Sequence, residues 1–211
     1  MKLYTAFRSS ASFRVRIALN LKGLAYEPAF VHLGRGEHRK PEYGALNPQA
    51  LVPAFEADGV RIVQSLAIIE YLEETHPEPP LLPRDAAARA RVRALSLFVA
   101  CEIHPLNNLR VLQHLKGSLG QNDEQVNAWY RHWITDGFRK LEAELSRAAA
   151  GRFCHGDAPT MADCCLVPQV FNAQRYQCDT ASYPTVMRVF TECMRLDAFD
   201  RAQPAKQPDA E

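Results

Sequence analysis

Three serines and three arginines lie within nine residues near the start of the chain, in the stretch RSSASFRVR, residues 8–16. A short apolar run precedes them and the helically spaced pattern SFRVRIALNLKG follows, so a strand is expected to lead into a helix there. The free amides and the dipole at a helix N-terminus favour a thiolate or a carboxylate. The stretch therefore predicts either a site for the sulfur of a bound thiol or, as is usual for serines before helices, a simple helix cap.

Two further turns of the backbone could also hold a ligand. We call these two turns and the start of the helix in residues 8–16 the three corners. At Leu51-Val52-Pro53 a cis peptide bond would turn the backbone of Val52 outward to pair with an extended peptide, although few X–Pro bonds are cis. Gln64 and Ser65 stand at an expected strand-to-helix turn. There a side chain and helix amides could hold the carboxylate of an α-amino acid, or Ser65 could serve only as a cap.

The elements that must position these corners are short strands and amphipathic helices. Period-2 patterns predict strands in residues 2–7 and 25–33 and a pair of strands around the turn Asp58-Gly59 in residues 51–65, and helical patterns cover residues 12–23 and 65–76. HPEPPLLPRD, residues 76–85, carries four prolines and predicts an extended linker. The order βαβ followed by ββα predicts a small α/β domain over residues 1–78.

Beyond the linker, hydrophobic residues recur with a period near 3.6, which predicts an all-helical domain over residues 86–211. Thr160 and Asp163 have the spacing of a capping box at the start of one of its helices. The end of the chain, QPAKQPDAE, is expected to be frayed.

Composition limits the class of protein. The chain has 211 residues, 47 % hydrophobic, and 25 basic against 24 acidic side chains, so net charge gives no reason to expect nucleic acid or an anionic membrane as partner. No signal peptide or run of about 20 apolar residues is evident, which favours a cytoplasmic protein. The six cysteines form no CxxC pair, and we expect reduced thiols rather than a metal site or disulfides.

The motifs together resemble one family over essentially the whole chain. RSSASFRVRIALNLKG, ALNPQALVPAFE, QSLAIIEYLEE, PEPPLLP, TMADCCLVPQV and YPTV are similar to the zeta class of glutathione transferases, which includes maleylacetoacetate and maleylpyruvate isomerases. The resemblance implies a thioredoxin-like N-terminal domain, a helical C-terminal domain, a homodimer and glutathione as coenzyme.

The resemblance also assigns site residues. It implies that Ser9 faces the glutathione sulfur, that Val52 before Pro53 pairs with the cysteinyl unit, and that His38 reaches the glycyl end. The remaining implied coenzyme contacts are Ser10, Ala11, Ser12, Phe13 and Arg14 in the sulfur-binding stretch, Gln64 and Ser65 at the γ-glutamyl end, and His104, Asn108, Leu109 and Arg110 in the helical half. Arg8 and Arg175 coincide with arginines that face an acidic substrate, and Arg110 joins them as a candidate for binding substrate or coenzyme.

The implied chemistry is cis–trans isomerisation of a small dicarboxylate. Addition of a thiolate turns the conjugated double bond into a single bond, and rotation followed by loss of the thiolate gives the trans isomer. A helix N-terminus and the Ser9 hydroxyl favour the thiolate, and arginines bind carboxylates through bidentate bonds. Ala11 stands where the family often has cysteine, so no protein thiol assists. Either the position tolerates any small residue, or side activities that use that cysteine are weaker.

The sequence therefore predicts a glutathione-dependent isomerase acting on maleylacetoacetate in tyrosine or homogentisate breakdown. Maleylpyruvate isomerisation in gentisate breakdown is the close alternative. Conjugation of glutathione to electrophiles, or a binding protein without activity, are further alternatives, and the arginine set argues against the latter.

Overall fold

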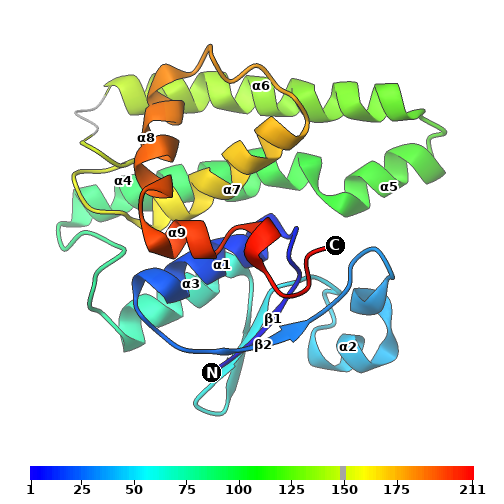
Figure 1. Cartoon of the computed structure of the whole chain (residues 1–211), viewed down its shortest axis with the longest axis horizontal. Helices are drawn as coiled ribbons and strands as arrows, with labels where there is room; N and C mark the ends of the chain where they lie inside the picture. The colour runs from blue at the N-terminus through cyan, green and yellow to red at the C-terminus, as the bar shows by residue number, and fades with distance from the viewer. Residues whose placement is uncertain (148–150) are drawn as a thin grey trace. The chain divides into compact units, whose positions relative to one another are not determined.

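The computed structural model describes residues 1–147 and 151–211. Internal contacts divide the chain into two compact units, one formed by Met1–Leu81 with Met194–Glu211 and the other by Leu82–Cys193. We call them unit 1 and unit 2; Figure 1 shows the sheet, with α1, α2 and α3, in unit 1 and the long helix α6 in unit 2.

Unit 1 is built on a four-stranded sheet with the order β2-β1-β3-β4. β1 (Lys2–Thr5) pairs in parallel with β2 (Glu27–Phe30) and antiparallel with β3 (Ala54–Ala57), which pairs antiparallel with β4 (Val60–Val63). Asp58 and Gly59 both have positive φ, 52° and 77°, as the tight turn predicted between β3 and β4 requires. The helices of this unit are α1 (Ser10–Leu21), α2 (Pro41–Leu46), α3 (Ser65–Thr75) and the 3₁₀ turn η1 (Glu37–Arg39).

Alternating side chains of the strands cover two faces of the sheet. Leu3 and Phe55, opposite each other in register, are fully buried, and Phe55 meets Tyr71 of α3 edge to face at 6.4 Å. Tyr4 points the other way and meets Tyr43 of α2 edge to face at 6.3 Å. α1 and α3 pack together, so two helices lie on one face and α2 on the other. This is the arrangement of a thioredoxin-like domain, which confirms the predicted fold.

The C-terminal end of the chain belongs to unit 1, not to the helical unit as the predicted boundary 86–211 has it. α9 (Asp197–Arg201) packs against α1, and the 3₁₀ turn η4 (Pro204–Lys206) follows. The end of the chain is not frayed either, because the Asp209 carboxylate accepts a hydrogen bond of 2.9 Å from the backbone N–H of Phe7. Partners about two hundred positions apart in the sequence leave no periodic pattern that would predict them.

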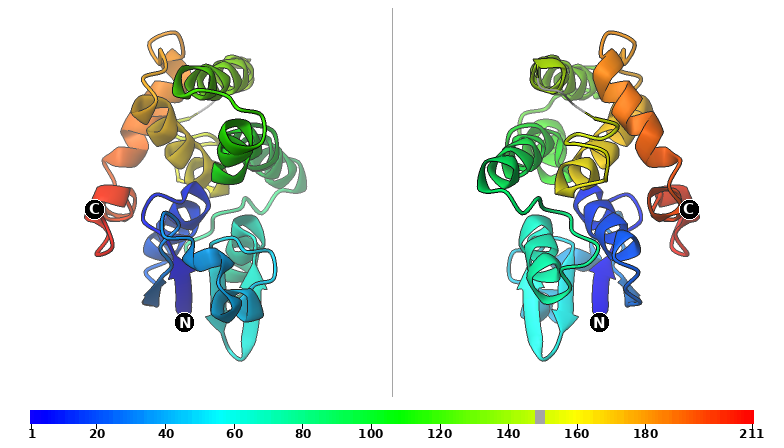
Figure 2. Two further views of the ribbon diagram at one scale, coloured as in Figure 1. Left: turned by 90° about the vertical axis from the view of Figure 1, so that its right-hand side faces the viewer. Right: turned by 90° about the vertical axis from the view of Figure 1, so that its left-hand side faces the viewer.

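Unit 2 is helical, as predicted. It contains α4 (Ala86–Leu97), a π-helical segment η2 (Phe98–Ile103), a 3₁₀ turn η3 (His104–Asn107), α5 (Leu109–Gly117), α6 (Asp123–Arg147), α7 (Met161–Arg175) and α8 (Pro184–Met194), which ends at the boundary with unit 1. α4 packs against α7, and the views along α6 in Figure 2 show these helices side by side. The predicted capping box is present, with Thr160 and the buried Asp163 bonded to each other's backbone.

Gly137 allows α6 to approach the π-helical segment closely. A Cβ at this position would lie 2.5 Å from Cδ1 and 2.6 Å from Cγ1 of Ile103, whose side chain is buried and has little room to move. We expect Gly137→Ala to lower the free energy of unfolding by about 1–3 kcal/mol through overpacking. Urea unfolding measures this, and Gly117→Ala, where a Cβ meets open space, is the matched control. Equal stability of the two variants would contradict the close packing of α6 on Ile103.

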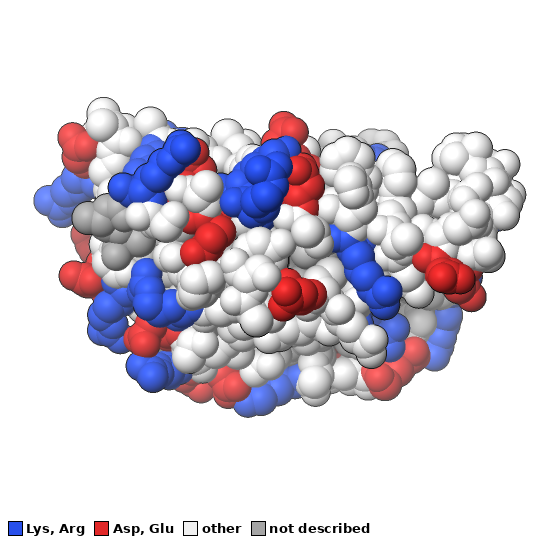
Figure 3. Space-filling view, turned by 90° about the horizontal axis from the view of Figure 1, so that it is seen from above, with Lys and Arg blue, Asp and Glu red and all other residues white. Residues whose placement is uncertain are grey.

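Two observations concern the surface. No helix within residues 1–147 and 151–211 is both long and apolar enough to cross a bilayer. On the face shown in Figure 3, Lys and Arg are interspersed with Asp and Glu, in keeping with the near-zero net charge.

Candidate active site

Ser9 is the N-cap of α1. Its Oγ accepts a hydrogen bond of 3.2 Å from the N–H of Ser12, and its backbone carbonyl accepts one of 2.8 Å from the N–H of Phe13. Since the Ser9 oxygen is occupied as an acceptor, its hydroxyl proton remains for an anion. The N–H of Ala11 has no hydrogen-bond partner within the described part of the chain. Ser9 is thus a helix cap, and its remaining donor suits a thiolate. The two interpretations of the serine stretch, a helix cap and a site for a thiol sulfur, are compatible with each other.

The other residues of the stretch lie behind this corner. Ser12 and Phe13 are buried, and the guanidinium of Arg16 lies 5.3 Å from the centre of the Phe13 ring. Arg14 is also buried, and its Nη1 donates a hydrogen bond of 3.2 Å to Oγ of Ser65. Arg14 therefore joins the start of α1 to the start of α3, two corners that the sequence predicted separately.

The second corner is the turn at Leu51-Val52-Pro53. The peptide bond between Val52 and Pro53 is cis. Val52 is buried, and neither its N–H nor its carbonyl is bonded to another group in residues 1–147 or 151–211. β3 begins just after it, at Ala54, so the backbone of Val52 is left for another extended segment to pair with.

The third corner is strained. Gln64 is the N-cap of α3 and has φ of 75° and ψ of 119°, a conformation that is rare for a residue with a Cβ. Its side chain is exposed and bonds Gln49 at 2.7 Å, while Ser65 is the first residue of α3 and is buried. Backbone strain of this kind concentrates at ligand-binding positions, and the amides at the start of α3 lie beside it.

His38 lies on η1 and is buried, with Nδ1 unbonded among the residues described. Burial, together with the nearby Arg39, lowers the pKa of His38 below its ordinary value. The imidazole is therefore neutral at neutral pH, and a neutral ring still has one N–H to donate to a carboxylate.

The lowered pKa of His38 predicts a pH dependence of stability. Above about pH 6.5 the ring is neutral in both folded and unfolded chains; below it the unfolded chain takes up the proton first, so folding stability falls. We expect unfolding free energy to decrease less between pH 7 and 5 in His38→Gln than in the native protein, measured by denaturant unfolding at each pH. The exposed His114 gives the control His114→Gln, and an unchanged slope in His38→Gln would contradict a neutral buried ring.

In unit 2, four predicted site residues lie between the end of α4 and the first turn of α5: His104, Asn108, Leu109 and Arg110. His104 is the first residue of η3, directly after the π-helical segment, an irregularity that often marks functional positions. Asn108 caps α5, and its side chain accepts a hydrogen bond of 3.2 Å from the N–H of Arg110. Leu109 and Arg110 are exposed at the first turn of α5.

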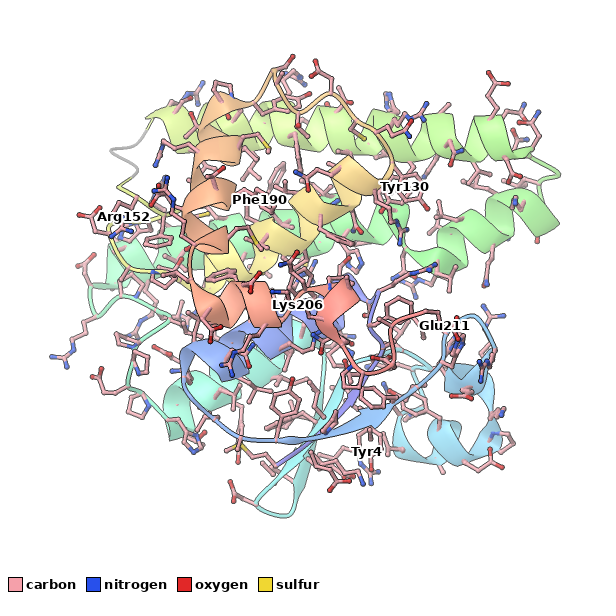
Figure 4. All side chains as sticks on the ribbon, in the orientation of Figure 1. Tyr4, Tyr130, Arg152, Phe190, Lys206 and Glu211 are labelled. Carbon is pink, nitrogen blue, oxygen red and sulfur yellow. The ribbon has the colours of Figure 1, made fainter. Side chains whose placement is uncertain are left out.

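Arg175 ends α7 and is exposed. Its guanidinium lies 4.9 Å from the centre of the Tyr176 ring and donates a hydrogen bond of 3.2 Å to the Tyr176 hydroxyl. Tyr176 stacks on Tyr130 of α6, with ring centres 3.5 Å apart, and Figure 4 shows Tyr130 beside the end of α7. The carbonyl of Tyr130 accepts a hydrogen bond of 3.2 Å from Asn107. Tyr130 thus lies between Arg175 and the segment that carries His104 and Asn108.

Tyr130, Tyr176 and Asn107 carry no sequence signal that marks them as site residues. Aromatic residues at helical spacing are read as core packing, and only their position next to Arg175 distinguishes these two. Arg8, the other predicted substrate-facing arginine, is exposed in unit 1 next to Ser9, with its guanidinium 4.9 Å from the centre of the Phe7 ring.

Comparisons with known proteins show what this chain is similar to. Residues 1–74 match the model of the glutathione S-transferase N-terminal domain. A probable maleylacetoacetate isomerase of Vibrio cholerae is 50 % identical over 210 residues, which cover 99 % of this chain and 97 % of that protein.

Two solved structures are also similar along the whole chain. One is the holo structure of a maleylpyruvate isomerase, described as a bacterial glutathione S-transferase of the zeta class, with 52 % identity, a TM-score of 0.98 and complete coverage of both chains. The other is maleylacetoacetate isomerase from Methylobacterium extorquens AM1 with bound malonate and glutathione, with 47 % identity, a TM-score of 0.97 and complete coverage of both chains.

Proposed function

Because this chain belongs to the zeta class of glutathione transferases, we propose that it isomerises maleylacetoacetate to fumarylacetoacetate with glutathione as coenzyme. The observation that carries the proposal is the hydrogen bonding of Ser9, whose oxygen accepts the Ser12 amide and whose proton is left to stabilise an anion at the start of α1. The names of similar proteins indicate the reaction, and the Ser9 hydroxyl at the start of α1 suits the thiolate that the reaction needs.

The residues of unit 1 fit the parts of glutathione. The backbone of Val52, which is unpaired within residues 1–147 and 151–211, suits the peptide of the cysteinyl unit, because an extended ligand pairs there as a strand does. The strained Gln64 and the first amides of α3 suit the γ-glutamyl carboxylate. The neutral His38 suits the glycyl carboxylate as a hydrogen-bond donor.

When bound, glutathione supplies a thiolate that adds reversibly to the double bond of the substrate. Ser9 and the start of α1 keep that sulfur charged near neutral pH, where a free thiol, with a pKa of about 8.5, is mostly protonated. We assign Arg8 and Arg175 to the substrate carboxylates and to the negative charge that develops on its oxygen. Ser9 is a hydrogen-bond donor in this scheme and forms no covalent bond.

Maleylpyruvate is the second candidate substrate. The maleylpyruvate isomerase structure is 52 % identical to this chain, slightly more than the maleylacetoacetate isomerases compared above. Arg110, exposed at the start of α5, suits the more compact diacid.

Three further properties are proposals that rest on the likeness to the class. We propose that the protein is a homodimer, that it is cytoplasmic, and that its reaction belongs to tyrosine or homogentisate breakdown. Light scattering of the purified protein tests the first of these directly, and a mass of one chain would contradict it.

The test of function follows the loss of absorbance of each cis substrate with purified protein, with and without glutathione. We expect isomerisation to require glutathione and kcat/KM to be higher for maleylacetoacetate than for maleylpyruvate. The reverse order would transfer the assignment to maleylpyruvate. Comparable rates without glutathione would overturn the thiol mechanism, and a chlorinated aromatic in place of the cis acid measures conjugation as a separate activity.

A further inference from the structure

The last residues of the chain return to the loop that carries Ser9. We call residues 202–211 the C-terminal segment; it follows α9, which is held on α1 by a hydrogen bond of 2.9 Å from Asn20 to the carbonyl of Ala198. Glu211, labelled in Figure 4, is the last residue of this segment. All these residues belong to unit 1.

The backbone of Phe7, two residues before Ser9, is held at both of its polar groups. Its N–H donates a hydrogen bond of 2.9 Å to Oδ2 of Asp209. Its carbonyl accepts one of 3.0 Å from Nη2 of Arg16, a side chain that is 1 % exposed. The Asp209 carboxylate and the Arg16 guanidinium both come from outside the loop, so they restrain the conformation of the loop.

Arg16 also joins the loop to the C-terminal segment. Its Nε donates a hydrogen bond of 3.1 Å to the carbonyl of Ala202, and its Nη1 contacts the carbonyl of Ala6 at 3.3 Å. Burial lowers the pKa of Arg16 to about 10, with Asp209 among the groups that oppose the change, so the guanidinium stays charged at neutral pH. A buried charge that bonds several carbonyls is costly to displace.

A second anchor holds the end of the segment. Oε1 of Glu211 contacts Nε2 of His32 at 2.7 Å and Nη2 of Arg35 at 3.1 Å, in the loop that leads to His38. These side chains are partly exposed, so solvent screens this contact more than the one at Phe7. Asp209 is therefore the side chain of the segment that bonds the backbone of the Ser9 loop directly, beside the link that Arg16 makes through Ala202.

We propose that Asp209, acting with Arg16, is a positioning residue that fixes the Phe7 peptide and thereby keeps Ser9 and the first amides of α1 oriented toward the coenzyme sulfur. This inference rests on the proposed function, because it concerns the same sulfur site. Asp209 does not touch the reacting atoms; it acts only through the backbone on which Ser9 is carried.

The test measures the bound thiol in the absence of substrate. Ultraviolet absorbance of the thiolate is titrated against pH in the complex of glutathione with the native protein and with Asp209→Ala, and kcat/KM is measured over the same pH range. We expect the pKa of the bound thiol to be higher by about 1 in the variant, a tenfold change in its ionisation equilibrium, so that a smaller fraction is thiolate near neutral pH. We expect the rate to return to within about twofold of the native value at high pH, where the thiol is ionised in both proteins.

Asp209→Asn distinguishes the hydrogen bond from the charge. Asparagine keeps an acceptor oxygen for the Phe7 N–H, so its thiolate titration is expected to lie close to the native curve. Asp197→Ala, which removes an exposed carboxylate of α9 that pairs with Arg201, is the matched control and is expected to change neither curve. If Asp209→Ala does not fold, Asp209→Ser, too short to reach the amide, replaces it with the same expectations.

The outcomes separate this inference from the proposed function. A native protein without glutathione-dependent isomerisation would overturn the function itself. An active native protein whose Asp209→Ala variant has an unchanged thiolate titration would overturn only the role of Asp209. A rate lowered equally at every pH, or an Asp209→Asn variant as impaired as Asp209→Ala, would overturn it as well.

Discussion

Replacing Ser9 with alanine is expected to lower kcat/KM for isomerisation about 100-fold near neutral pH. The variant loses a hydrogen bond to a charged sulfur, worth about 1.5–3 kcal/mol, and a helix cap worth about 1 kcal/mol. The cap matters to the site because the Ser9 oxygen also accepts the Ser12 amide at the start of α1. Steady-state rates and the thiolate titration of the glutathione complex measure both consequences.

Ser9→Thr is the control for this prediction. Threonine keeps the hydroxyl that caps the helix and donates to the sulfur, so most of the activity and a nearly native thiolate titration are expected. A Ser9→Ala variant that retains the native thiolate fraction would show that the amides of α1 stabilise the sulfur without the hydroxyl. The role proposed for Ser9 would then be contradicted.

Replacing Arg175 with alanine is expected to lower isomerase turnover about 100-fold while the Kd for glutathione stays within about twofold. A donor aimed at developing negative charge contributes roughly 3 kcal/mol in comparable sites, and Arg175 is assigned to the substrate rather than the coenzyme. Its guanidinium is oriented by the ring and hydroxyl of Tyr176. Turnover and glutathione binding are measured separately, by steady-state kinetics and calorimetry.

Arg131→Ala is the matched control for Arg175. Arg131 is also exposed, and its Nε donates a hydrogen bond of 2.9 Å to the carbonyl of Tyr176, so its removal disturbs the same neighbour without removing the proposed substrate contact. We expect turnover to fall less than about threefold, since an exposed hydrogen bond contributes about 1 kcal/mol or less. Equal losses of turnover and glutathione affinity in Arg175→Ala would remove Arg175 from the substrate site.

Local signals in the sequence predicted the parts of the fold that depend on neighbours in the chain. The Asp58–Gly59 pair predicted a hairpin turn because both residues tolerate positive φ, and both adopt it. Thr160 and Asp163 predicted a helix start because the capping box depends on a spacing of three residues. Alternation in the strands reflects the two faces of the sheet, which Leu3 and Tyr4 occupy.

Contacts between residues that are far apart in the sequence are not predicted by local sequence patterns. The family resemblance places Arg14 in the sulfur-binding stretch, and no sequence pattern predicts the hydrogen bond from its buried side chain to Ser65. The polar, proline-containing end of the chain predicts fraying, and this prediction is wrong, because Asp209 bonds the amide of Phe7. In each case one polar side chain meets a group far away in the sequence, and neither composition nor periodicity records such a pair.

The candidate site likewise has one part that local sequence predicts and another part that it does not. A stretch of serines before a helical pattern predicted an anion-binding corner, since a helix N-terminus has that property wherever it forms. The surroundings of Arg175 were not predictable in this way. The stack of Tyr176 on Tyr130 depends on how α6 and α7 pack, and no local sequence pattern predicts which side chains of two packed helices meet.

The central claim is that a thiolate held at the start of α1 carries out the isomerisation. S-methylglutathione, which keeps every group of the coenzyme except the ionisable thiol, tests it most directly when it replaces glutathione in the maleylacetoacetate assay. We predict no isomerisation with S-methylglutathione alone and competitive inhibition when both compounds are present. Isomerisation at the glutathione rate with the methylated compound would contradict the claim.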